Sequence, residues 1–128
     1  MTLVLDSEGL AKAVLRDLEV SHWLAAARSE DERVITSAAT LVEVIHPRIN
    51  RRAFDWAISR VSVEPVTPEI ARLACDLLER VGKHGHKYAI DAILAATALS
   101  APGRSVVLTS DPEDMTMLCG NDVTVVKV

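Results

Sequence analysis

Five acidic residues stand beside apolar segments in a pattern that could do chemistry. They are Asp6, Glu43, Asp91, Asp111 and Asp114. Carboxylates in apolar surroundings are costly unless they are paired or bound to metal, and no lysine or arginine adjoins Asp6, Glu43 or Asp91 in the sequence. Several oxygen ligands with few nitrogen or sulfur ligands suit Mg²⁺ or Mn²⁺. Such a site could activate water and stabilise an in-line displacement at phosphorus.

Each acid also has a simpler structural explanation. Asp6 could cap the first helix, and Glu43 could be an exposed position on a surface helix. Asp91 could be an acid that the helix dipole favours near a helix start. The run from Asp111 to Asp114, Asp-Pro-Glu-Asp, is itself a good helix start. The occurrence of all these acids in comparable settings favours one shared site over separate structural roles.

Strands that alternate with helices must position these acids. The expected strands cover residues 2–5, 34–36, 61–66, 105–109 and 123–128. This alternation predicts an α/β fold, a three-layer α/β/α sandwich with a short, mainly parallel central sheet. We expect residues 1–128 to form one domain, with the first strand at the centre and Asp6 at its carboxyl end. Open α/β sheets bind their ligands at that edge.

Helix starts and stops follow recognisable signals. Thr67-Pro68-Glu69 supplies a cap, a first-turn proline and a first-turn acid, and Gly82 ends the helix that follows. Ser7, Ser21 and Ser37 are expected to begin earlier helices, the last of these running from 38 to 45. Residues 83–87 are expected to form a basic loop before an apolar, buried helix over 89–99.

Composition bounds the remaining possibilities. The net charge of −4 argues against a nucleic-acid partner at first sight. Apart from the five candidate acids, however, acidic residues nearly balance the 14 lysines and arginines, and a bound cation would offset much of the site's charge. Cys75 and Cys119 form no CxxC pair, and neither a signal peptide nor a membrane span is evident. We therefore expect a cytoplasmic protein without a membrane partner.

Four motifs together resemble the PIN domain, a small nuclease fold that includes VapC-type toxins. They are Leu3–Ser7, Thr36–Val44, Ala89–Ala96 and Leu108–Asp114, of which the third is the most specific. The resemblance covers essentially the whole chain. It implies an endoribonuclease dependent on Mg²⁺ or Mn²⁺, the toxin of a type II toxin–antitoxin pair, with a cognate antitoxin and a homodimeric state.

The resemblance also implies roles for residues. Asp6, Glu43, Asp91 and either Asp111 or Asp114 would hold metal, and Thr109 would line the site. Two features depart from the family pattern. The first acid is followed by Ser7-Glu8 in place of Thr-Asn, and Asp111 stands where many members have Asn. Whether Asp111 or Asp114 is the fourth acid stays open at this point.

Basic residues could bind the RNA phosphates. We expect Arg48, Arg51, Arg52 and Lys87 to form the rim of the substrate site. His84 and His86 could contact RNA or belong to a polar surface loop. Two other functions stay open as well: a catalytically silent PIN fold that serves as a protein-interaction module, and a housekeeping RNA-processing nuclease without an antitoxin.

Overall fold

The computed structural model describes residues 1–128 and contains five strands and seven helices. The strands are β1 (Thr2–Leu5), β2 (Arg33–Ser37), β3 (Ser62–Glu64), β4 (Ser105–Thr109) and β5 (Thr124–Lys127). The helices are α1 (Ser7–Val14), α2 (Leu18–Ser29), α3 (Thr40–Val44), α4 (Arg51–Ile58), α5 (Pro68–Val81), α6 (Gly85–Ser100) and α7 (Pro112–Cys119).

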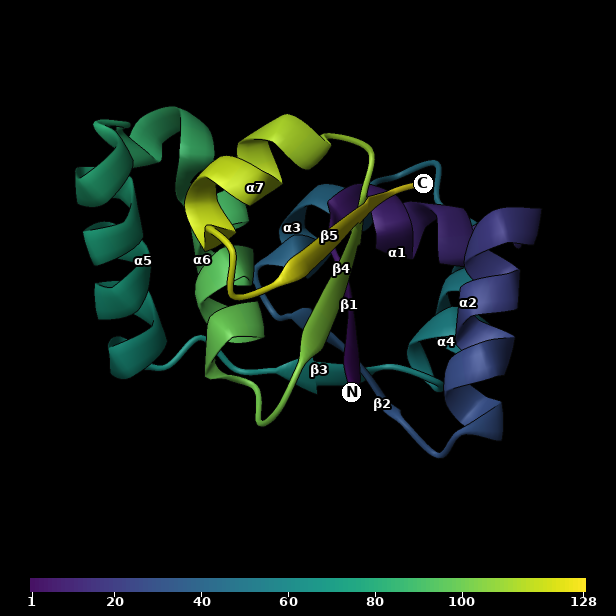
Figure 1. Cartoon of the computed structure of the whole chain (residues 1–128). Coiled ribbons are helices and arrows are strands. Elements are labelled where there is room, and N and C mark those ends of the chain that lie inside the picture. Colours follow the sequence, from purple (N-terminus) through teal and green to yellow (C-terminus); the bar gives the residue numbers. More distant parts are fainter.

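All five strands form one parallel sheet in the order β3-β2-β1-β4-β5. Figure 1 shows this sheet nearly edge-on, with α5, α6 and α7 on one face and α1, α2 and α4 on the other. The predicted three-layer α/β/α sandwich is therefore confirmed, as is the central position of the first strand. The sheet is wholly parallel rather than mainly so.

Alternation of side chains along β1 divides the core into two parts. Val4 packs with the helices α5, α6 and α7, whereas Leu3 and Leu5 pack with α1, α2 and α4. All three side chains are completely buried. The apolar composition of this short strand is explained by its burial on both faces, which a central parallel strand requires.

Capping side chains fix where the helices begin, and here the structure corrects the sequence analysis. Asp6 rather than Ser7 caps α1, because its Oδ1 accepts from the Gly9 N–H at 2.7 Å. Asp17 rather than Ser21 caps α2. The predicted cap of α5 is confirmed, since Thr67 Oγ1 accepts from the N–H of Ile70. In each case an acceptor satisfies a free N–H of the first helical turn.

Two helices near the sheet's carboxyl edge differ from prediction. The helix after β2 is shorter than expected, because α3 begins only at Thr40, while Ser37 accepts from the Ala39 N–H just before it. The helix α6 begins earlier, at Gly85, so that His86 and Lys87 are helical. Asp91 consequently lies well inside α6, beyond the first turn where the helix dipole favours an acid. None of the helices is long and apolar enough to cross a membrane.

Candidate active site

Asp6 lies where β1 ends and α1 begins, and only 8% of its surface is exposed. Burial raises the pKa of this carboxyl, while hydrogen bonding to Thr109 and to the Gly9 N–H opposes the rise. The cap occupies Oδ1. The predicted capping role is thus real, but the cap uses only one of the two oxygens, and the Thr109 hydroxyl is a second hydrogen-bond partner of the carboxylate.

Asp91 is the centre of the electrostatic cluster. Burial, followed by the negative charges of four other carboxylates, raises its pKa to about 6. Those carboxylates are Glu43, Asp6, Asp114 and Asp111, in decreasing order of effect. All four act on Asp91, and Asp6, Glu43 and the pair Asp111 and Asp114 follow the carboxyl ends of β1, β2 and β4, so the five predicted site residues lie toward the same edge of the sheet.

Glu43 reaches the site from α3, and a hydroxyl of α1 holds it. Ser7 Oγ donates a hydrogen bond to Glu43 Oε1. Beneath α3, the fully buried Thr36 donates to the Leu5 carbonyl oxygen at 2.7 Å, and its hydroxyl lies 3.0 Å from that of Thr40. These contacts connect the ends of β1 and β2 to the helix that carries Glu43.

Asp111 and Asp114 belong to the junction between β4 and α7. Asp111 caps α7 through a 3.3 Å contact with the Asp114 N–H, while its own N–H donates to Thr109 Oγ1 at 3.0 Å. Burial and the neighbouring Asp111 raise the pKa of Asp114, and the ammonium groups of Lys87 and Lys83 oppose that rise. Both acids therefore belong to the cluster, and Thr109 connects their loop to Asp6.

The donor set fits a hard divalent cation. Five carboxylates converge, the charge of Asp91 is opposed by all the others, and neither a histidine nor a cysteine is among the groups that act on it. A cation would relieve this repulsion. No three acidic, histidine or cysteine side chains are placed so that they could already hold one ion together. The carboxylates would have to close around it.

The predicted basic rim divides into two parts. Lys87 lies near the acids, since its charge acts on Asp114. Arg48 and Arg52 instead line a pocket of about 730 Å³ between α1, α4 and the segment that joins α3 to α4, and none of the five acids lines this pocket. Arg51 begins α4 and is exposed.

Sequence reasoning missed two contributions. The hydroxyl of Ser7 was considered only as a cap, although the family pattern has threonine at that position, and the shared hydroxyl was the available signal. Lys83 was part of the basic loop but was not assigned to the site. Its proximity to Asp114 depends on packing between α5, α6 and α7 (Figure 1), which no local pattern reports.

Comparison with known proteins agrees with this geometry. The sequence pattern of the PIN domain matches residues 3–115, a range that includes all five acids. The chain belongs to the PIN domain family. No curated protein sequence matches this PIN domain.

Solved structures share its fold at low sequence identity. One chain of VapBC2 from Rickettsia felis, crystallised on a promoter DNA fragment, has a TM-score of 0.77 and 14% identity, covering 100% of this PIN domain and 99% of that chain. A chain of DNA-bound VapBC from Salmonella typhimurium has a TM-score of 0.74 and 19% identity, covering 99% of this PIN domain and 98% of that chain. A chain of FitAcB from Neisseria gonorrhoeae has a TM-score of 0.66 and 22% identity, covering 96% of this PIN domain and 95% of that chain.

Proposed function

We propose that this PIN domain is a divalent-metal-dependent endoribonuclease that hydrolyses RNA phosphodiester bonds and acts as the toxin of a type II toxin–antitoxin pair. The observation that carries the proposal is the effect of four other carboxylates on Asp91, which together with its burial, the larger cause, raises the pKa of Asp91 to about 6. The PIN domain family is generally one of nucleases, and such nucleases typically use divalent metals. Mg²⁺ and Mn²⁺ both suit an all-oxygen donor set.

Different residues of the site have different proposed roles. The cation would be held by Asp6, Glu43 and Asp91, with Asp111 or Asp114. When bound, the cation supplies charge stabilisation at the reacting phosphate. The Asp6 cap fixes the carboxylate so that its other oxygen stays at the sheet edge, and the Ser7 hydroxyl orients Glu43. The Thr109 hydroxyl holds the backbone of the loop that carries Asp111 and Asp114.

Cleavage of a total RNA pool tests this proposal. We expect hydrolysis with Mn²⁺ or Mg²⁺, none with EDTA, and a loss of orders of magnitude in Asp91→Asn, because the acids can activate water only through the cation. Asp76→Asn, which removes an exposed acid from α5, is the matched control and should keep full activity. Full cleavage in EDTA would exclude the metal mechanism. A folded parent that cleaves no RNA with either ion would favour the silent interaction module.

An antitoxin partner is the second part of the proposal. The pocket between α1 and α4 has an apolar floor that includes Val14, Val44, Ile49 and Trp56, and Arg16, Arg48 and Arg52 surround it. We propose that it accepts an amphipathic antitoxin helix whose apolar face is flanked by acidic side chains. The VapBC and FitAcB structures, which are complexes, support an antitoxin partner.

Arg52 separates the two uses proposed for the basic residues of α4. If Arg52 binds RNA, Arg52→Gln should lower the salt dependence of RNA binding; if it binds the antitoxin, the substitution should weaken the protein complex instead.

Co-expression with a small adjacent reading frame should yield a stable complex and suppress toxicity. Unchanged toxicity on co-expression would favour the housekeeping nuclease.

A homodimer completes the proposal. Leu15, Leu18 and Val42 are 81%, 71% and 77% exposed, which is unusual for large apolar side chains. Burial of such residues between two copies would remove them from water. Sedimentation of the protein without its antitoxin should give the mass of a dimer, whereas a monomer at micromolar concentration would exclude this part of the proposal.

A further inference from the structure

Tyr88 carries two ammonium groups against its ring. The Nζ of Lys87 lies 5.2 Å from the ring centroid and that of Lys83 lies 5.8 Å from it. Lys83 belongs to the turn between α5 and α6, where Gly82 adopts the left-handed conformation (φ +67°) that ends α5. Lys87 and Tyr88 belong to the first turn of α6. The turn thus brings both lysines to the same ring.

This group adjoins the acidic cluster. Tyr88 precedes Asp91 by three residues on α6, and residues three apart lie on the same face of a helix. Both lysines also act electrostatically on Asp114, at the start of α7. The aromatic ring and its two cations therefore border the carboxylates on the side formed by α6 and α7.

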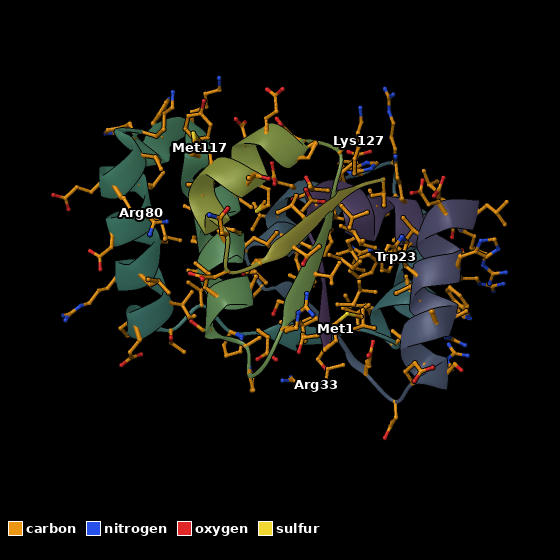
Figure 2. The ribbon with its side chains drawn as sticks, viewed as in Figure 1. Met1, Trp23, Arg33, Arg80, Met117 and Lys127 are labelled. Atoms are coloured by element: carbon orange, nitrogen blue, oxygen red, sulfur yellow. The ribbon has the colours of Figure 1, made fainter.

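The other aromatic side chains lie elsewhere. Phe54 and Trp56 belong to α4 and Trp23 to α2, all in the opposite helical layer, and Figure 2 shows Trp23 on the side of α2 that faces the sheet. Trp56 is moreover covered by the guanidinium groups of Arg16 and Arg60, at 4.3 and 4.0 Å from its centroid. Tyr88 is thus the sole aromatic residue of the helical layer that carries Asp91 and Asp114.

We propose that Tyr88, Lys83 and Lys87 form the binding site for the RNA nucleotide next to the scissile phosphate. Tyr88 stacks on the base, and the two lysines bind the adjoining phosphates. A cluster of carboxylates repels a phosphate backbone, so the substrate needs cations beside the acids. A ring flanked by ammonium groups is the combination that binds single-stranded nucleic acid with little sequence preference. This proposal rests on the proposed nuclease function.

Binding of a single-stranded RNA that contains 2-aminopurine tests the site. Titrations are made with EDTA, and with Mg²⁺ in proteins that also carry Asp91→Asn, so that binding is measured without hydrolysis. Tyr88→Leu should weaken binding about tenfold and lose the fluorescence quenching that stacking on the ring causes. Tyr88→Phe keeps the ring and should retain both.

The lysines have a separate signature. For single strands, each phosphate contact contributes about 0.7 to the slope of log affinity against log salt. Lys83→Gln and Lys87→Gln should each lower the slope by about that amount. Arg72→Gln, which removes an exposed charge near the other end of α5, is the matched control and should leave the slope unchanged. Because Lys83 and Lys87 are exposed, these variants should fold normally.

The outcomes distinguish this site from the nuclease proposal. If the parent binds and cleaves RNA while the Tyr88→Leu and lysine variants bind it equally well, the site is wrong and the nuclease stands. If the variants lose affinity for the antitoxin alone, the surface binds protein and the RNA assignment is overturned. If the parent neither binds nor cleaves RNA, both proposals fail together.

Discussion

Replacement of Asp91 by asparagine should stabilise the protein when no metal is present. Partial burial and, after it, four neighbouring carboxylates raise the pKa of Asp91 from 3.8 to about 6. A carboxyl whose pKa is higher in the folded than in the unfolded state costs stability whenever the pH exceeds its unfolded pKa. Asparagine keeps the shape of the side chain and removes the charge that is repelled.

The size of the effect follows from the pKa difference. A rise from 3.8 to about 6 corresponds to about 3 kcal/mol at neutral pH, and solvent screening of this partly exposed carboxyl reduces it to about 1–2 kcal/mol. For a chain of 128 residues, that free energy raises the melting temperature by about 4–7 °C. The gain in stability of Asp91→Asn over the parent should be complete above pH 6, shrink as the pH falls, and vanish near pH 4.

Thermal melts of the parent, Asp91→Asn and Asp76→Asn provide the measurement. In EDTA at pH 7.5 Asp91→Asn should melt highest, while Asp76→Asn, which loses an exposed charge on α5, should match the parent. Saturating Mg²⁺ should narrow or reverse the difference in melting temperature between Asp91→Asn and the parent, because the parent binds the ion more tightly than the variant does. If Asp91→Asn melts well below both proteins in EDTA, the ionised Asp91 stabilises the fold and the repulsive cluster does not exist.

Substitutions at three positions test the junction of β1 and α1. Gly9→Ala should destabilise the fold by about 1–3 kcal/mol in urea unfolding, because a Cβ would lie 2.9 Å from the Leu108 carbonyl oxygen; an unchanged midpoint would contradict this packing. Ser7→Ala should lower RNA cleavage by releasing Glu43, and Ser7→Thr should restore it. Asp6→Asn should abolish cleavage but keep a urea midpoint close to that of the parent, since asparagine caps helices as well as aspartate does. A decrease of more than about 2 kcal/mol in the free energy of unfolding would show that the charge of Asp6 stabilises the fold.

The fold was predictable because its signals are local. The apolar run of β1, the cap and proline that begin α5 and the glycine that ends it specify elements without reference to distant residues. The rule that βαβ units form parallel sheets then predicts that the strands share one parallel sheet. The predicted caps that proved wrong, Ser7 and Ser21, each had an aspartate shortly before them, Asp6 and Asp17, that caps the helix instead.

That the five acids gather at one edge of the sheet was predictable, whereas the surroundings of these acids were less so. Carboxylates among apolar residues are conspicuous in a sequence, whereas exposed arginines and lysines are common on any surface. Arg48 and Lys87 were given the same predicted role, but one lines a pocket beside α4 and the other acts on Asp114. Only the packing of helices distinguishes them. One such contact is the 3.1 Å hydrogen bond that Arg80 on α5, labelled in Figure 2, donates to the Leu118 carbonyl oxygen of α7.

The structural and functional roles of the acids are compatible, and the architecture explains why. At the carboxyl edge of a parallel sheet each strand leads into a helix, so a residue at that junction both begins a helix and faces the ligand crevice. Asp6 and Asp111 each use Oδ1 to accept an N–H of the helix that follows, so that the cap does not occupy Oδ2. A cap signal therefore cannot count against a catalytic acid at such a junction. What distinguishes a site from a set of caps is whether the acids act on one another, and after burial the four other carboxylates contribute to the raised pKa of Asp91.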